Sequence, residues 1–424
     1  MVAMGILQEL VKDIPLPGMV SVKQRFPAER LTDVEAAVRA ELRKAESMIR
    51  PGTEIAVAVG SRGVDQLVTI TRETVRMIRE RGAIPFLVPS MGSHGGATAE
   101  GQVAVLRHLG VTEETVGAEI RSSMEVIQVG TLPNGLPVYI DQYASNADGI
   151  VVINRIKPHT AFRGRVESGL MKMISIGLGK QKGAEACHQL GFGHMAENVP
   201  AMAKMLIEKM PILFGVATVE NAFDKVARVA VVTMDQLEAA EIELLKEAKS
   251  LLPRIMFDQI DVLVIDEIGK NISGDGMDPN ITGRYPTPFA HGGPEVNKMV
   301  VLDLTEETEG NANGVGTADF TTQRLVDKID LEKTYANGLT STVVAPTKIA
   351  TTLANDREAI QGAIKTCNIL NFAGVKLVRI KNTLMLGEIE ISEALLPQAL
   401  ANPDVEILSE PYEWKFDEQG NFLK

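Results

Sequence analysis

Basic side chains gather directly after an apolar, strand-like stretch in the middle of the chain. The run GIVVINRI is typical of a buried strand, and Lys157, His159, Arg163 and Arg165 follow it closely. Because charge-assisted hydrogen bonds to carboxylate or phosphate are strong, four such side chains at a strand end indicate an anion pocket. The alternative is a solvated basic loop, which would be unusual in a chain whose net charge is −12.

Two further candidates for chemistry follow in the next segment. Lys172 lies within LMKMISI, whose apolar side chains would desolvate it and favour the nucleophilic free amine. His188 and His194 have a side chain that commonly binds metals, but neither makes the i,i+4 pair of a helical zinc site. Spacing alone therefore leaves a structural role for His188 as open as a metal-binding one.

Two glycine-rich loops nearer the N-terminus each hold one side chain suited to a site. EIAVAVGSRG ends in a turn with Arg62, and AIPFLVPSMGSHGGAT ends in a loop with His94. The small neighbours of His94 would let a ligand approach the backbone closely, although a turn histidine with a local hydrogen bond fits the same pattern. In parallel sheets ligands bind where the carboxyl ends of strands emerge, so both loops point to one site.

Strands alternate with helices along the chain, which predicts an α/β fold with mainly parallel sheets. Helical periodicity follows both glycine-rich loops, the second time over 99–109, and a Leu-rich helix over 236–252 is suited to linking two domains. A second α/β region begins at Phe257. We therefore predict an N-terminal domain over 1–255, a C-terminal α/β domain over 256–424, and an active site in the cleft between them.

The second region has a polar loop, GKNISGDGMDPNITGR, after its first strand. Its acidic residues loosely suggest a calcium loop, but the DxDxDG pattern is absent and Lys270 would repel a cation. We therefore expect Lys270 to reach a site shared with the first domain.

The composition argues against several classes of protein. The net charge of −12 disfavours nucleic-acid binding, which needs a basic surface. Only Cys187 and Cys367 occur, without a CxxC pair, which fits a reducing compartment and excludes a disulfide framework. The start MVAMGILQELVKDI lacks a basic leader, and no run approaches the roughly 20 apolar residues that span a bilayer. We expect a cytoplasmic protein without membrane attachment.

Taken together, these loops resemble the nickel-pincer-nucleotide-dependent lactate racemase family of 2-hydroxy acid racemases and epimerases. The motifs that carry the resemblance, in the family's order, are GSRG at 60–63, MGSHGGAT at 91–98, KPHTAFRG at 157–164, SGLMKM at 168–173 and ACHQ at 186–189. Lys172 and His188 are 16 positions apart (188 − 172), which looks like the family's spacing of lysine and nickel ligand. The resemblance spans the first domain and is weaker in the second.

The resemblance implies a nickel-pincer nucleotide, a pyridinium mononucleotide that holds nickel through sulfur and carbon. His188 would be the protein ligand to nickel, and Lys172 would hold the cofactor, either covalently as a thioamide or by pairing with its charge. Ser61 and Gly95 would contact the cofactor from the two glycine-rich loops. Residues 1–255 would then be the cofactor-binding domain. Cofactor-synthesis enzymes are implied partners, and the protein could form a homo-oligomer.

The implied reaction inverts the hydroxyl-bearing carbon of a small 2-hydroxy acid. His94 and His159 would be the acid/base residues, one for each enantiomer, and Arg62 would bind the carboxylate. One histidine takes the hydroxyl proton while hydride passes from the adjacent carbon to the cofactor. The planar 2-keto acid that results would receive the hydride back on its other face. Lys270 would lie near the substrate or cofactor.

Two departures from the family pattern bear on the substrate and the first loop. VGSRG lacks the acid that precedes the family's arginine and the proline that follows it, so the contacts of this loop with the cofactor would differ. The chain between His159 and Lys172 is longer and adds Arg163, Arg165 and Glu167. The extra arginines suggest a larger or doubly charged substrate, such as malate or a sugar acid.

Two other functions are compatible with the sequence. A metal-dependent hydrolase or lyase would use His159, His188 and His194 with a divalent ion. A non-catalytic binding protein for an anionic metabolite would need only the arginines.

Overall fold

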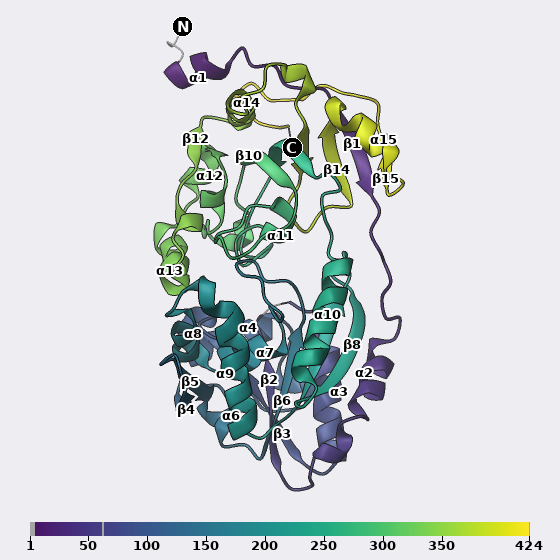
Figure 1. Ribbon diagram of the computed structural model, residues 1–424, viewed down its shortest axis with the longest axis vertical. Coiled ribbons are helices and arrows are strands. Elements are labelled where there is room, and N and C mark those ends of the chain that lie inside the picture. The colour runs from purple at the N-terminus through teal and green to yellow at the C-terminus, as the bar shows by residue number, and fades with distance from the viewer. Residues whose placement is uncertain (1–4, 62, 424) are drawn as a thin grey trace. The chain divides into compact units, whose positions relative to one another are not determined.

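The computed structural model describes residues 5–61 and 63–423 and divides into two compact units (Figure 1). One, the N-terminal unit, is Pro27–Leu252. The other, the C-terminal unit, combines Met1–Phe26 with Pro253–Lys424. The chain passes between the units within a few residues of the predicted boundary.

The prediction that the start of the chain belongs to the N-terminal domain is wrong. Strand β1 (Met19–Gln24) pairs antiparallel with β14 (Glu388–Ser392) and with β15 (Val405–Ile407). A short strand such as β1 cannot be assigned to a sheet from its own sequence, because its partners lie more than 350 residues further on.

The N-terminal unit is built on a five-stranded sheet in the order β3-β2-β6-β7-β8. Its strands are β2 (Glu54–Val59), β3 (Ile84–Pro89), β6 (Gly149–Arg155), β7 (Ile212–Glu220) and β8 (Val226–Thr233). The first four strands in the chain run parallel, and β8 returns antiparallel beside β7. All but the first residue of β2 and of β3 are buried, as expected for a parallel sheet covered on both faces.

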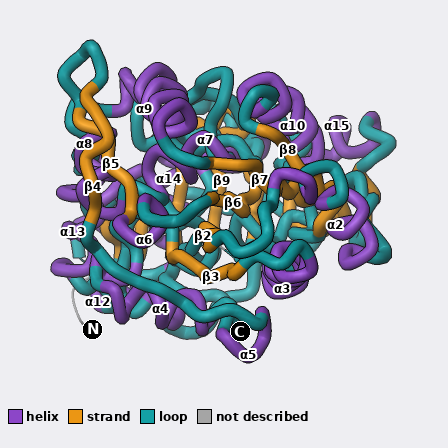
Figure 2. The backbone as a smooth tube through the Cα atoms, turned by 90° about the horizontal axis from the view of Figure 1, so that it is seen from below, coloured by secondary structure: helices purple, strands orange, loops and turns teal. Residues whose placement is uncertain are grey.

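Helices cover both faces of this sheet, as Figure 2 shows. One face packs against α2 (Val34–Leu42) and α3 (Leu67–Glu80), and the other against α7 (Leu170–Lys172) and α10 (Leu237–Leu251). The remaining elements are α4 (Ala99–His108), α5 (Glu113–Val116), α6 (Gln142–Ser145), α8 (Lys180–His188), α9 (Met195–Lys209) and the hairpin of β4 (Val126–Thr131) with β5 (Pro137–Asp141). The predicted α/β class is confirmed.

The C-terminal unit has an eight-stranded sheet in the order β12-β11-β10-β9-β13-β14-β1-β15. The first five strands in this order, from β12 to β13, run parallel to one another. Each later neighbouring pair, β13 with β14, β14 with β1 and β1 with β15, is antiparallel. Besides β1, β14 and β15, the strands are β9 (Gln259–Ile265), β10 (Glu295–Val301), β11 (Phe320–Thr322), β12 (Thr351–Leu353) and β13 (Leu377–Ile380). Its helices are α1 (Ile6–Val11), α11 (Pro279–Thr282), α12 (Gln323–Asp327), α13 (Leu331–Ser341), α14 (Asp356–Thr366) and α15 (Leu396–Ala401).

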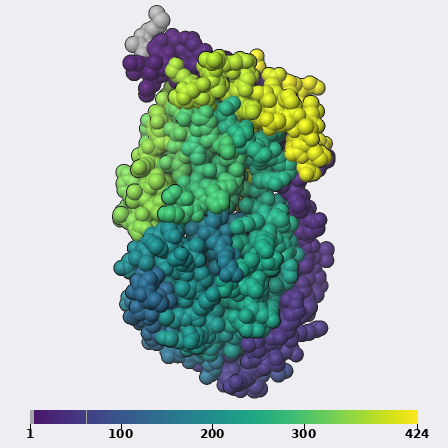
Figure 3. Space-filling view, in the orientation of Figure 1, coloured from purple at the N-terminus to yellow at the C-terminus, as the bar shows by residue number. Residues whose placement is uncertain are grey.

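Helix α1 lies on the outside of the C-terminal unit, against α14 (Figure 3). Its Ile6, Leu7 and Leu10 side chains are exposed. Within the described residues, no helix has both the length and the apolar character that crossing a membrane requires.

Candidate active site

Three loops of the N-terminal unit leave the carboxyl ends of the adjacent parallel strands β3, β2 and β6 and therefore share one edge of the sheet. A π-helical turn, Met173–Gly177, packs against them. A Cβ on Gly60 would lie 2.7 Å from Met173 Cε, and one on Gly177 would lie 2.8 Å from the Ser90 carbonyl oxygen. The two strand ends can approach the turn this closely because both positions are glycine.

His94 is exposed in the loop after β3, and its Nδ1 lies 2.5 Å from Ser61 Oγ in the loop after β2. Gly95 has a φ of 67°, and a Cβ there would lie 2.6 Å from the Gln102 amide nitrogen, so the path of the loop requires glycine. The two glycine-rich loops thus meet. Arg62, predicted to bind the substrate carboxylate, lies outside the described residues.

His159 is buried in the loop after β6, with its ring centroid 4.4 Å from that of Phe162. The Ala161 amide donates to its Nδ1 at 3.0 Å, and its Nε2 lies 2.8 Å from Lys172 Nζ. Since a backbone N–H can only donate, Nδ1 carries no proton and the neutral ring holds its proton on Nε2. That proton points at Lys172, which accepts it as the free amine because an ammonium has no lone pair.

Electrostatics agree with this assignment. Burial is the largest cause that holds the pKa of His159 well below its ordinary value, so the ring is neutral. The neutral imidazole is the form that accepts a proton from a substrate hydroxyl. To accept one at Nε2, the ring must first move its proton to Nδ1, which gives up the hydrogen bonds with the Ala161 amide and with Lys172.

His188 lies at the end of α8, half-buried, with its ring 5.3 Å from that of Phe192. The ring of His159 is 6.2 Å from the same phenylalanine, so the two histidines flank it. Nδ1 of His188 donates to the Ala184 carbonyl at 2.6 Å, which leaves the Nε2 lone pair for another partner. Burial is the main cause that lowers the pKa of His188, so the ring is neutral and able to bind a metal.

Arg163 and Arg165, both predicted to bind substrate, have different surroundings. Arg163 is partly buried and donates to the His159 carbonyl at 2.6 Å and to Glu167 at 3.3 Å. Arg165 has an exposed side chain that pairs with Glu238 of α10 at 3.4 Å. Arg163 therefore supports the loop that carries His159, and Arg165 lies outside the cluster formed by the other residues.

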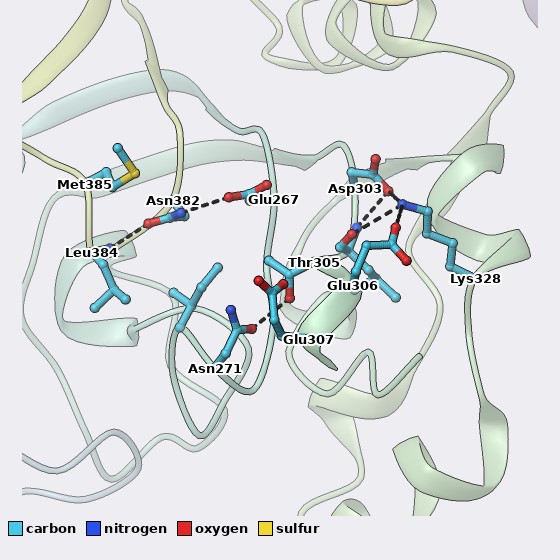
Figure 4. Close-up of a pocket in the computed structure, with 12 residues that line it drawn as sticks. Glu267, Asn271, Asp303, Thr305, Glu306, Glu307, Lys328, Asn382, Leu384 and Met385 are labelled. Atoms are coloured by element: carbon cyan, nitrogen blue, oxygen red, sulfur yellow. Dashed lines mark hydrogen bonds and ion pairs between the residues drawn. The ribbon is translucent and has the colours of Figure 1, made fainter. Parts of the chain in front are cut away.

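Lys270 belongs to the C-terminal unit, in the loop after β9. Its Nζ donates to the Gly274 carbonyl at 2.5 Å and to Asn337 Oδ1 at 2.6 Å. A cavity of about 390 Å³ lies near the carboxyl ends of β9, β10 and β13 in the same unit (Figure 4). Its walls are Glu267, Asn271, Ile272, Asp303, Leu304, Thr305, Glu306, Glu307, Lys328, Asn382, Leu384 and Met385. None of the predicted site residues that the structure describes lines this cavity.

Sequence reasoning missed a buried carboxyl group that supports Lys172. Glu241 of α10 is 1% exposed and accepts the Met171 amide at 2.9 Å at the start of α7, one residue before Lys172. Burial raises the pKa of Glu241 to about 7. The sequence around Glu241 did not indicate that its side chain is buried, because a glutamate on an amphipathic helix normally faces solvent.

We expect the Glu241→Gln variant to gain stability relative to the wild type as the pH rises. Because the folded pKa of Glu241 lies above the unfolded one, its stabilising contribution is complete below pH 4.5 and is lost as the pH rises to about 7. The loss amounts to about 3 kcal/mol at most. The melting temperature of the variant minus that of the wild type should increase between pH 5 and pH 8. Glu243→Gln, at an exposed position of the same helix, should show no such trend.

A second buried group was also missed. Lys180 is fully buried at the start of α8, with its Nζ 3.2 Å from Asp141 Oδ2 and 3.0 Å from Gln102 Oε1, and it also donates to the Pro89 carbonyl. Burial lowers the pKa of Lys180 and raises that of Asp141, while their mutual attraction opposes both shifts. Lys180 has a φ of 55°, a conformation that side chains disfavour and that these contacts hold.

Comparison with known proteins gives one family. Residues 13–200 match the family described as the lactate racemase N-terminal domain. This segment is a lactate racemase N-terminal domain. The domain contains all five motifs from GSRG to ACHQ, and it relates the chain to racemases, which are isomerases. No curated protein matches the chain.

One solved structure with a similar fold is the lactate racemase apoprotein from Thermoanaerobacterium thermosaccharolyticum. It is 14% identical, with 92% of this chain and 96% of that chain covered and a TM-score of 0.48. His94, His159, Lys172 and His188 lie within the matched residues 13–200, whereas Lys270 lies beyond them.

Proposed function

We propose that the protein is a racemase or epimerase that inverts carbon 2 of a small 2-hydroxy acid and uses a nickel-pincer nucleotide. The observation that carries the proposal is the cluster of His159, Lys172 and His188 around Phe192, inside a lactate racemase N-terminal domain. The substrate class is lactate, malate or a sugar acid.

The donors in the cluster fit a cofactor that brings most of its own nickel ligands. His188 offers one lone pair, and the Nδ1–H bond to Ala184 fixes the tautomer that exposes it. Among residues 5–61 and 63–423, no three His, Cys, Asp or Glu side chains are grouped to hold a bare ion. His194 is exposed, so the alternative of a hydrolase with a three-histidine metal site is less favoured.

When bound, the cofactor would supply the hydride acceptor that the protein's side chains lack. Lys172 would hold it through the amine that already faces His159. Engagement of that amine would leave the Nε2–H of His159 free to donate its proton to a substrate oxygen, and the ring that has lost this proton could take one back from the hydroxyl of the other enantiomer. His94, exposed and anchored to Ser61, would serve the other enantiomer.

Substrate recognition would rest on Arg62 and, from the longer loop, on Arg163. Since Arg165 is exposed and paired with Glu238, it adds nothing to the anion pocket. The pocket would therefore have one arginine fewer for a doubly charged substrate than the sequence suggested. Arriving cofactor would come from separate synthesis enzymes.

The test is chiral analysis of full-length protein produced together with cofactor-synthesis enzymes, with D-lactate, D-malate and D-gluconate incubated separately. We expect inversion of at least one substrate and stoichiometric nickel. His188→Ala should lower nickel affinity at least about 100-fold, since even groups that only orient a ligand are worth 10- to 100-fold. His108→Ala, at an exposed position, is the control. A nickel-loaded wild type that inverts none of the three would contradict the proposal.

A further inference from the structure

A buried amide lies directly behind the loop that carries His94. Gln102 of α4 is 0% exposed, and its Nε2 donates to the Gly92 carbonyl at 2.9 Å and to the His94 carbonyl at 3.3 Å. The two acceptor carbonyls belong to the first and last residues of the segment 92–94. A buried amide with both hydrogens directed at one loop acts on the conformation of that loop.

Lys180 fixes which way this amide points. An ammonium can only donate, so the 3.0 Å contact with Lys180 Nζ must use Oε1 of Gln102. The NH2 group is then left to face the loop carbonyls. Asp141, 3.2 Å from Lys180 Nζ, keeps the ammonium charged in this buried place.

The loop has few regular contacts of its own. Gly92, Gly95 and Gly96 all have positive φ, and glycine gives the chain more freedom than any other residue. The His94 amide donates to Met91 within the loop at 3.2 Å, and the Gly92 amide donates to Gly177 at 3.3 Å. The two bonds from Gln102 add a buried anchor to these contacts of the 92–94 backbone.

We propose that Gln102 is a positioning residue, oriented by Lys180, that sets the place of His94 in the site. The proposal rests on the proposed function only where it concerns catalysis. Its structural part, that Gln102 holds the 92–94 backbone, stands without any substrate or cofactor.

The decisive variant is Gln102→Glu. The carboxylate keeps the size of the side chain and the acceptor for Lys180 and has no hydrogens for the two loop carbonyls, but it adds a negative charge beside the buried Asp141–Lys180 pair. Because both bonds to the loop are lost, we expect amide hydrogen exchange at Gly92 and His94 to quicken roughly 10- to 100-fold. The measurement uses the full-length protein without cofactor. Gln142→Glu, on the exposed side of α6, is the matched control.

In the loaded enzyme, Gln102→Glu should lower kcat by roughly 10- to 100-fold with KM nearly unchanged, because a small displacement of an acid/base group slows the reaction more than it weakens binding. A purely structural role would lower thermal stability without changing the ratio of kcat to KM. If Gln102→Glu does not fold, Gln102→Met is used, which also lacks the donor; its exchange at Gly92 and His94 should quicken as well.

Unchanged exchange at Gly92 and His94 in a folded Gln102 variant would overturn the proposal. So would unchanged kcat in an enzyme whose wild type racemises its substrate. Faster exchange in a protein whose wild type shows no racemisation would sustain the positioning of the loop and count against the proposed function alone.

Discussion

Lys180→Met is expected to lower the free energy of unfolding of the N-terminal unit by about 3–5 kcal/mol, the usual cost of removing one partner of a buried ion pair. The substitution leaves the Asp141 carboxylate buried without its cation and deprives Gln102 and the Pro89 carbonyl of a donor. For a unit of this size the loss corresponds to a fall of roughly 10 °C in melting temperature.

The expected loss depends on pH. Because burial already raises the pKa of Asp141, that carboxyl group can be protonated in the variant, and the penalty should shrink towards acidic pH. Lys182→Met, two positions further on the same helix and exposed, should change the melting temperature very little.

The double variant Lys180→Met with Asp141→Asn separates charge from packing. Removing both charges of a buried pair costs much less than removing one, so the double variant should recover part of the stability. Thermal unfolding monitored at pH 5 and pH 8 measures both effects. Equal melting temperatures for Lys180→Met and Lys182→Met would show that the buried pair contributes nothing to stability.

His94→Asn and His159→Asn are each expected to slow racemisation by roughly 10²- to 10⁴-fold, the usual contribution of a positioned acid/base group. Under the proposed mechanism, interconversion needs both histidines, since one serves each enantiomer. Either variant should therefore lose the complete reaction in both directions. The two losses should be similar even though His94 is exposed and His159 is buried.

The half-reactions should differ between the two variants. Each variant retains one histidine and should still oxidise a single enantiomer to the 2-keto acid, which can be trapped and quantified in a single turnover. The enantiomer consumed by His94→Asn should be the one that His159→Asn leaves untouched. Rates are normalised to nickel content, because His159 also contacts Lys172. Consumption of the same enantiomer by both variants would refute the division of roles.

Local sequence determined the elements and their order. The apolar run at 149–156 became β6 (Gly149–Arg155), and the predicted helix over 236–252 became α10 (Leu237–Leu251). Such elements are readable because burial against a sheet imposes a period on neighbouring residues. The parallel arrangement follows from the alternation of strands and helices, and it brought the loops of Ser61 and His94 to one edge.

The tertiary structure alone decided which side chains are partners. Asp141 and Lys180 come from the end of a hairpin strand and the start of α8, and neither segment signals the other. Glu241 looks like a solvated helix residue until α10 is packed against the start of α7. Arg163 and Arg165 are near neighbours in one basic run, yet only Arg163 supports His159. The periodicity of a segment indicates which of its residues face the core. Contacts between side chains of distant segments depend on how the whole chain packs, so no local sequence pattern predicts them.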